Sequence, residues 1–212
     1  MTLKLYGRLQ STNTQRVILI LKEKKIPYEL VEVEFGQNNQ PERLQFQPFA
    51  EIPYIDDDGF ILYESRAIAR YLVAAYPEHG PTLVPPPSAG LRAQALFEQA
   101  LSVEAFNFYP TVSSILMERL FKPFIGQTPD EAEIATLTEK LDARLAGYER
   151  VLSKSKYLAG DEVTLADLFH IPLLTLFGLG QIDDFTNDEK VKKWPSVARW
   201  ANELVQRGSV QA

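Results

Sequence analysis

The sequence contains no cysteine and only two histidines among its 212 residues. The absence of cysteine excludes disulfide bonds, thiolate-bound metals and a catalytic thiol supplied by the protein. With only His79 and His170 available, a histidine-rich metal site is not expected either. Acidic residues outnumber basic ones, so the net charge is −6, and no basic stripe interrupts this balance. Nucleic acid is therefore not an expected partner.

Long apolar runs are missing as well. The longest, residues 171–180, is too short to span a bilayer and contains a proline. The first residues, MTLKLYG, lack the apolar core of a signal peptide. We therefore expect a cytoplasmic protein with no membrane partner. The composition, 45% hydrophobic and 24% charged, is typical of a folded protein that buries a sizeable core.

The chain changes character near residue 77. Segment 77–88, PEHGPTLVPPPS, has five prolines in twelve residues, which disfavours both helix and regular sheet. Strands alternate with helices before this segment, and nearly every stretch after it has helical periodicity. We predict three parts: a first domain over 1–76, a proline-rich linker over 77–88 and an all-helical domain over 89–212.

The first part has the pattern of a small α/β domain. Apolar runs predict strands at 3–7 and 27–34 and a hairpin over 52–64, in which DDDG forms the turn. Helical spacing predicts helices over 14–25 and from Ser65 to about Tyr76. This order predicts a sheet of mixed strand directions with helices on its faces.

The second part is predicted to consist of helices. Residues 89–121 form one long helical run in which Pro110 is expected to cause a kink or break. The helix within 128–152 is predicted to begin with Thr128 as N-cap, Pro129 at the first helical position and Glu131 closing a capping box.

A second capping box is predicted in TLADLFHIPLL, residues 164–174. Thr164 and Asp167 have its spacing, which gives Asp167 a structural role. His170 is predicted to be a core histidine, and Trp194 and Trp200 are predicted to pack the C-terminal helix.

The stretch FILYESRAIARYL, residues 60–72, places an acidic residue and a serine between a strand and a helix. One interpretation is that Ser65 caps the helix. Another is a small receptor, because a hydroxyl and the backbone N–H groups at a helix N-terminus favour an anion and Glu64 favours a cation. Such a pair suits the carboxylate and ammonium of an amino acid.

Four stretches resemble the cytosolic glutathione transferases, and the phi class in particular. They are YGRLQSTNTQRV, QPFAEIPYIDDDGFILYESRAIARYL, EAFNFYPTVSSILMERLFKPFIGQTPDEA and SKYLAGDEVTLADLFHIP. The resemblance covers both halves of the chain. It implies a thioredoxin-like α/β N-terminal domain and an all-α C-terminal domain, glutathione as co-substrate without a metal, and a homodimer.

The resemblance also implies how the glutathione thiol is activated. Ser11 matches the serine that donates a hydrogen bond to the glutathione sulfur, so that it stabilises the thiolate without acting as a base. Asn13 is a second candidate for this role. The alternative is that the polar run 11–14 caps the first helix.

The other glutathione-binding residues are implied by the same resemblance. Glu64 and Ser65 would bind the γ-glutamyl end, and Pro53 would be a cis-proline that presents the backbone of Ile52 to the cysteinyl part. The remaining predicted contacts are Asn38, Asn39, Gln40, Glu51 and Arg66.

Two positions depart from the phi pattern. Asn38, Asn39 and Gln40 stand where that class has a histidine and a lysine that hold the glycyl carboxylate, and Glu51 stands in place of the usual glutamine. Neutral amides can donate hydrogen bonds but bring no charge, and Glu51 would repel an anionic peptide unless its side chain points away. Both changes predict weaker or differently placed glutathione.

The second substrate is expected to be an apolar electrophile. The predicted contacts come from both domains and are apolar or aromatic; for each the alternative is a place in the core. They are Leu9, Phe35, Phe106, Tyr109 and Phe177.

We therefore predict a glutathione transferase that conjugates glutathione to apolar electrophiles, with reduction of peroxides as a side activity. Two alternatives remain open. One is a carrier for aromatic or hydrophobic small molecules, and the other is a regulatory interaction module on the same fold. The presence of Ser11, Glu64 and Ser65 argues against the module, which has no need of them.

Overall fold

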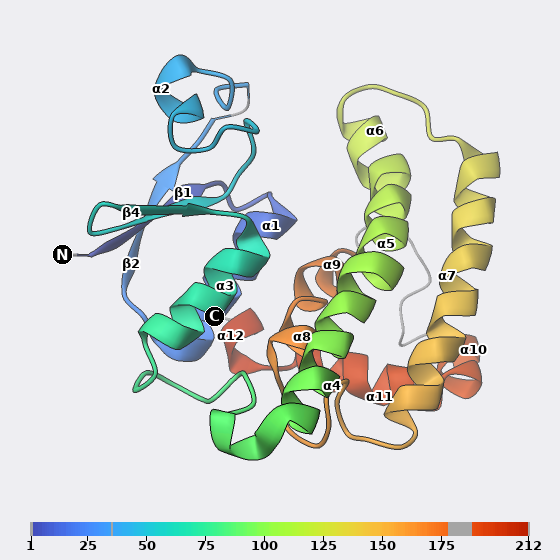
Figure 1. Ribbon diagram of the computed structural model, residues 1–212. Coiled ribbons are helices and arrows are strands. Elements are labelled where there is room, and N and C mark those ends of the chain that lie inside the picture. Colours follow the sequence, from blue (N-terminus) through green and yellow to red (C-terminus); the bar gives the residue numbers. More distant parts are fainter. Residues whose placement is uncertain (1, 35, 178–187, 212) are drawn as a thin grey trace. The chain divides into compact units, whose positions relative to one another are not determined.

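The computed structural model describes residues 2–34, 36–177 and 188–211. The chain divides into two compact units, Met1–Leu83 and Val84–Ala212 (Figure 1).

The first unit is built on a four-stranded sheet. Its strands are β1 (Leu3–Gly7), β2 (Tyr28–Glu32), β3 (Tyr54–Asp57) and β4 (Phe60–Tyr63), in the order β2-β1-β3-β4. β2 is parallel to β1, whereas β3 is antiparallel to both β1 and β4. The predicted sheet of mixed directions and the hairpin at Asp58 and Gly59 are thus confirmed.

Helices α1 (Thr12–Lys24) and α3 (Ser65–Ala75) pack against each other, and Figure 1 shows the short α2 (Pro41–Leu44) on the opposite side of the sheet from α3. The core of the unit is made of apolar side chains with no exposed surface, from β1, β3 and these two helices. They are Leu5, Val17, Ile20, Leu21, Ile55, Ile68, Ala69 and Leu72.

The C-terminal part of α3 is attached to the β3–β4 hairpin through a carboxylate. Asp57, the last residue of β3, accepts hydrogen bonds from the hydroxyls of Tyr71 at 2.7 Å and of Tyr76 at 3.0 Å. The pKa of Tyr71 is raised to about 12, mainly by burial and next by the hydrogen bond to Asp57. This hydroxyl therefore remains a donor over the physiological range. These bonds help to set the position of α3, whose other end carries Ser65.

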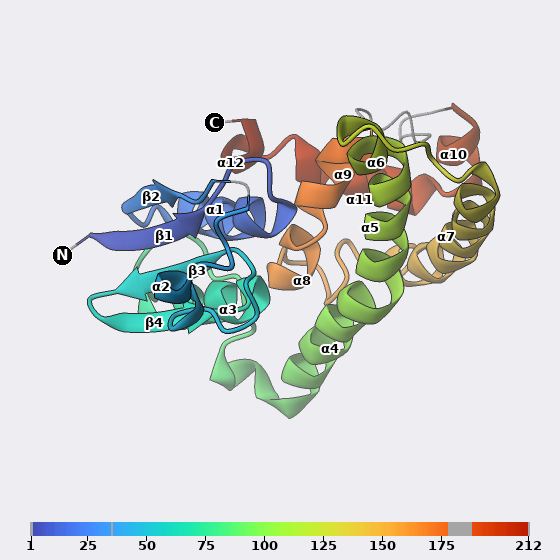
Figure 2. The ribbon, with the colours of Figure 1, turned by 90° about the horizontal axis from the view of Figure 1, so that it is seen from above.

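The second unit is helical, as predicted. After a 3₁₀ turn (Pro87–Ala89) and α4 (Gly90–Val103), its helices are α5 (Tyr109–Leu116), α6 (Lys122–Phe124), α7 (Glu131–Leu152), α8 (Leu165–Leu168), α9 (Ile171–Phe177), α10 (Asp188–Lys193), α11 (Pro195–Val205) and α12 (Gly208–Gln211). α4, α5 and α6 follow one another as one rod, and α7 lies beside α5 (Figure 2).

The rod is interrupted twice by π-helical segments, Glu104–Phe108 and Met117–Phe121. Each is followed directly by a helix with proline at its second position, Pro110 in α5 and Pro123 in α6. Proline has no N–H to donate to the preceding turn, so a change of hydrogen-bond pattern beside it is expected. The predicted break at Pro110 is therefore confirmed in the form of a π segment.

The core of the helical unit is aromatic around His170. The centroid of the His170 ring lies 4.5 Å from that of Phe108, in a tilted arrangement, and 4.9 Å from that of Trp200, in an edge-to-face arrangement. Its Nε2 lies 2.9 Å from the Tyr148 hydroxyl. His170 and Trp200 have no exposed surface, which confirms both as core residues. Trp194 is half-buried at the start of α11 and donates from Nε1 to Asp142 of α7.

The predicted Thr164–Asp167 capping box is present, but the predicted start of α7 is wrong. The helix begins at Glu131, and its N-cap is Asp130, whose Oδ1 accepts from the N–H groups of Ala132 and Glu133 at 3.0 and 3.1 Å. Thr128 therefore lies before the N-cap, because the carboxylate of Asp130 reaches the N–H groups of Ala132 and Glu133, which have no partner within the helix.

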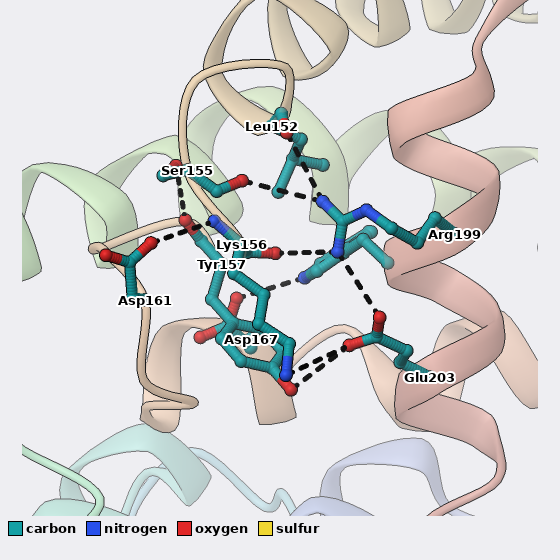
Figure 3. Close-up of polar contacts among 9 residues, drawn as sticks. Leu152, Ser155, Lys156, Tyr157, Asp161, Asp167, Arg199 and Glu203 are labelled. Carbon is teal, nitrogen blue, oxygen red and sulfur yellow. Dashed lines mark hydrogen bonds and ion pairs between the residues drawn. The ribbon is translucent and has the colours of Figure 1, made fainter.

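Arg199 of α11 closes the other end of α7 (Figure 3). Its Nη2 donates to the carbonyls of Leu152 at 3.3 Å and Ser155 at 3.5 Å, and its Nη1 donates to that of Lys156 at 3.1 Å. A cation at a helix C-terminus satisfies orphan carbonyls and opposes the negative end of the dipole.

Asp167 receives four hydrogen bonds and has no exposed surface. Its Oδ1 accepts from the N–H of Leu158 and from Nε1 of Trp200, both at 3.0 Å, and its Oδ2 accepts from the N–H and hydroxyl of Thr164 at 2.9 and 3.1 Å. Burial raises the pKa of the Asp167 carboxyl, and these hydrogen bonds act in the opposite direction. The predicted structural role of Asp167 is consistent with this geometry.

No helix in the part of the chain that the structure describes is both long and apolar enough to cross a bilayer.

We expect Asp167→Asn to lower the free energy of unfolding by about 3 kcal/mol, because an amide NH₂ would face donors and each buried unpaired group costs roughly 1–3 kcal/mol. Urea denaturation measures this change. The control is Asp161→Asn, since Asp161 is exposed and, within the described residues, accepts one long bond, 3.4 Å from the N–H of Lys156. Equal stability of the two variants would contradict the role given to Asp167.

Candidate active site

The connections of the first unit that carry the predicted glutathione residues leave the same end of the sheet. β1 and β2 are parallel and end there, β4 ends there, and the antiparallel β3 begins there. The register pairs Tyr54 with both Tyr6 and Tyr63, which places Pro53 and Glu64 next to each other in the ladder. The segments after β1, after β2, before β3 and after β4 therefore come together, although they are far apart in the sequence.

Ser11 is the N-cap of α1. Its Oγ accepts a hydrogen bond from the N–H of Thr14 at 3.3 Å, and its side chain is half-buried. This bond uses an oxygen lone pair, so the hydroxyl hydrogen remains available to donate. The capping alternative is thus correct for Ser11, and it is compatible with the predicted donor role.

The first turn of α1 contains no acidic residue. The positive end of the helix dipole is therefore not opposed by a local carboxylate at this point, which favours a negative charge close to Ser11.

Ser65 does not cap α3, so the capping interpretation of that residue is wrong. It is the first residue of the helix, is 6% exposed, and its Oγ accepts a hydrogen bond of 2.8 Å from Nη1 of Arg16. The N-cap position belongs to Glu64, whose side chain is exposed and makes no capping bond.

The backbone of Glu64 is strained, with φ of 71° and ψ of 106°. A residue other than glycine held in such a region costs on the order of 1–3 kcal/mol, and such residues cluster at functional sites. The strain supports a functional reason for the position of Glu64.

Arg16 is a site residue that the sequence analysis missed. It has no exposed surface and donates from Nη1 to Oδ1 of Asn13 at 2.5 Å as well as to Ser65, so it joins the start of α1 to the start of α3. The available signal was a single charged residue directly before VILIL, in the buried part of a helix.

The segment before β3 has the geometry that the resemblance implied. The Ile52–Pro53 peptide bond is cis, and both residues are buried. Glu51 is exposed. Arg66, which follows Ser65, is half-buried.

The loop after β2 carries the three neutral amides. Asn39 and Gln40 are exposed, and Gln40 precedes α2 without capping it. Oδ1 of Asn38 is enclosed and accepts no hydrogen bond from the described residues.

Neither unit, taken by itself, brings the predicted contacts of the apolar substrate together. Leu9 is 57% exposed in the first unit, and in the second Phe106 is 78% exposed and Tyr109 is half-buried. Phe35 lies outside the described residues. Phe177 is the last residue of α9, but its side chain also lies outside the described part.

Among the described residues, no group of three histidine, aspartate or glutamate side chains could hold a metal ion. The groups at the end of the sheet are the hydroxyls of Ser11 and Ser65, side-chain amides, two exposed carboxylates, the buried Arg16 and backbone N–H groups. Such groups can bind a zwitterion and stabilise an anion.

Comparison with known proteins identifies the family. Residues 5–81 match the family model described as glutathione S-transferase, N-terminal domain, and residues 108–207 match the one described as glutathione S-transferase, C-terminal domain. The chain belongs to the glutathione S-transferase family. Its predicted fold, family and enzyme class are confirmed, with glutathione as the co-substrate of this family.

Individual relatives support the phi-like type. Glutathione S-transferase PM239X14 of Arabidopsis thaliana is 43% identical over 209 residues, which are 96% of this chain and 92% of the relative. Glutathione S-transferase F11 of the same plant is 37% identical over 210 residues, covering 98% and 94%. A solved glutathione S-transferase I with bound lactoylglutathione is 32% identical, with a TM-score of 0.88 and coverage of 100% and 97%.

The turn that carries Ser11 depends on a close contact behind it. A Cβ added at Gly7, the last residue of β1, would lie 2.6 Å from Oγ1 and 2.7 Å from Cγ2 of Thr14, whose side chain is fully buried. We expect Gly7→Ala to lower the free energy of unfolding by about 1–3 kcal/mol through overpacking.

The control for this variant is Gly147→Ala. A Cβ at Gly147, inside α7, meets nothing within 4 Å, so this change should raise stability by roughly 0.5–1 kcal/mol through helix propensity. Thermal unfolding of both variants compares them. Stability changes of the same sign in both variants would show that the Gly7–Thr14 contact leaves room for a Cβ at position 7.

Proposed function

We propose that the enzyme activates glutathione by a hydrogen bond from the Ser11 hydroxyl to the sulfur, and that it conjugates the resulting thiolate to apolar electrophiles. The observation that carries the proposal is the geometry of Ser11 at the N-terminus of α1, where its oxygen accepts from Thr14 and its hydrogen remains available. Reduction of peroxides is a proposed side activity of the same thiolate.

The free energy needed to lower the pKa of the glutathione thiol is modest. A free thiol ionises near pH 8.5, and lowering its pKa by one unit takes about 1.4 kcal/mol of preferential stabilisation of the anion. A hydrogen bond to a charged group contributes roughly 1.5–3 kcal/mol, and a helix N-terminus adds to it. A serine donor at this position is therefore sufficient for a thiolate near neutral pH, without a protein base.

The rest of the tripeptide would be bound along the same end of the sheet. We propose that Ser65 and the N–H groups of α3 bind the γ-glutamyl carboxylate, that Glu64 binds its ammonium, and that the backbone of Ile52 pairs with the cysteinyl part. Arg66, Glu51 and the loop 38–40 complete the proposed contacts.

The domain roles, the dimer and the location also belong to the proposal. We assign glutathione binding to residues 1–76, a linker role to 77–88, and contacts with the apolar substrate to 89–212 together with Leu9 and Phe35. Phe106, Tyr109 and Phe177 are the proposed contacts from the helical part. A homodimer in the cytoplasm is the expected form of the enzyme.

A carrier for hydrophobic molecules is the second candidate. The observation in its favour is the loop 38–40, where neutral amides, exposed at Asn39 and Gln40, are predicted to face the glycyl carboxylate without a positive charge. Glutathione that binds but keeps the pKa of the free thiol would favour the carrier over the enzyme.

The first test uses Ser11→Gly and Ser11→Thr. Glycine removes the hydroxyl at a capping cost of only a few tenths of a kcal/mol, whereas threonine keeps both hydroxyl and cap. We expect the pKa of bound glutathione, from ultraviolet difference titration, to rise by roughly one to two units in Ser11→Gly. It should change little in Ser11→Thr.

The control is Ser153→Ala, which removes an exposed serine hydroxyl at the end of α7. It should leave the titration unchanged. An unshifted thiol pKa in Ser11→Gly would remove Ser11 from the activating role.

The neutral loop generates a second test. We expect Asn39→Lys to strengthen glutathione binding several-fold, because a cation beside a carboxylate in a partly solvated site contributes on the order of 1 kcal/mol. Calorimetric titration with glutathione measures the affinity. Gln45→Lys adds the same charge at another exposed position just after α2, so an equal gain there would indicate a general electrostatic effect instead of a local contact.

A further inference from the structure

Arg16 is a cation in the interior of a small domain. Its side chain has no exposed surface, although charged groups are costly to remove from water. Its Nη1 donates to Oδ1 of Asn13 at 2.5 Å and to Oγ of Ser65 at 2.8 Å. These two acceptors lie at the starts of the two helices that meet at the proposed glutathione site.

The bond to Arg16 fixes which way the Asn13 amide points. A guanidinium has only donors, so the atom that faces it must be the amide oxygen. The Asn13 NH₂ group is therefore turned away from Arg16 and offers its two hydrogens elsewhere. Because Oδ1 of Asn13 lies 3.5 Å from Oγ of Ser65, this amide sits beside Ser65.

The same reasoning applies to the Ser65 hydroxyl. Its oxygen accepts from Arg16, so its hydrogen must point in another direction. The Asn13 oxygen, at 3.5 Å, is too distant for a strong O–H···O bond, for which about 2.7–2.8 Å is usual. The hydroxyl hydrogen is thus available to a better acceptor.

We propose that Arg16 is a positioning residue for the γ-glutamyl carboxylate of glutathione. By occupying an oxygen of Asn13 and the oxygen of Ser65, it turns an amide NH₂ and a hydroxyl into donors for an anion at the start of α3. Its buried charge adds to the attraction for that anion. This inference rests on the proposed function, and it assigns Asn13 to the γ-glutamyl carboxylate instead of the sulfur.

A purely structural role is the competing explanation. α1 and α3 pack against each other, and the bonds of Arg16 to both helix starts would stabilise that contact whether or not a ligand binds. The two explanations differ in what they predict for a ligand that lacks the carboxylate.

The experiment compares binding of glutathione with binding of 4-aminobutyryl-cysteinylglycine, the same molecule without the γ-glutamyl carboxylate. Calorimetric titration on the full chain gives both dissociation constants. We expect the wild type to prefer glutathione by roughly ten- to a hundredfold, the range for hydrogen bonds to a charged group. Arg16→Met and Ser65→Ala should each reduce this preference to a few-fold, and the double variant should reduce it little further.

Asn13→Asp keeps the test valid if Arg16→Met does not fold. An aspartate still accepts from Arg16, so the fold is retained, but it loses the NH₂ donors and adds a negative charge beside the ligand carboxylate. The preference for glutathione should then disappear or reverse. Asn202→Asp, a half-buried position in α11, is the matched change of charge and should leave the preference intact.

Two results of the binding experiment would overturn the proposal. One is an unchanged preference for glutathione in Asn13→Asp. The other is a folded Arg16→Met that binds both ligands more weakly by the same factor, which is the result expected of a structural role.

The thiol titration separates this inference from the proposed function. At saturating glutathione, the neutral variants Ser65→Ala and Asn13→Ala should keep the wild-type pKa of the bound thiol, whereas Ser11→Gly should not. A thiol pKa that rises in Asn13→Ala as much as in Ser11→Gly would move Asn13 to the sulfur and contradict the assignment. A wild type that binds glutathione without lowering its thiol pKa would instead refute the proposed activation by Ser11.

Discussion

The candidate site depends on two helix N-termini that are held at the same end of one sheet. α1 follows β1 and α3 follows β4, and the antiparallel arrangement of β3 brings these two starts together. Each start has backbone N–H groups without helical partners and the positive end of a dipole.

The sequence adds few charges of its own to this pair of helix starts. One serine hydroxyl lies at each start, an arginine lies buried between them, and the carboxylate of Glu64 is exposed. The proposed binding of an anion here would therefore combine backbone N–H groups and helix dipoles with the few side-chain donors at the two starts.

Much of the first unit could be predicted from the sequence because its signals are local. Alternation of apolar residues and the DDDG turn are sufficient to predict β1 and the β3–β4 hairpin, and helical spacing predicts α1 and α3 within two residues. The four-residue α2 was missed because it is too short to have a period.

The errors at helix starts have a different cause. Thr128 and Asp130 are both good N-caps, and the spacing to Glu131 favoured the first. The structure selects Asp130, whose carboxylate reaches two N–H groups. At the start of α3, Ser65 faces Arg16, a contact across 49 residues of chain that no local pattern contains.

Other contacts of the site could not be predicted because they join residues on different helices and strands. Periodicity places Arg16 on a helix but does not predict that its guanidinium group is buried against two polar side chains. Both the burial and the contact with Ser65 arise only when α1 packs on α3. The contact between Gly7 and Thr14 is similar, since it joins the end of a strand to the inside of the next helix.

The two π segments of the second unit have a consequence for how the length of its sequence can vary. A π segment amounts to one additional residue in a helix, and in an uninterrupted α-helix such a residue would turn every later side chain by about 100°. Because the π segment absorbs the additional residue locally, loss of one residue at Glu104–Phe108 or Met117–Phe121 would return that segment to α-helical spacing and leave the later side chains of the rod facing as before. The rod can therefore lose a residue at either place without turning α5 away from α7, against which it packs.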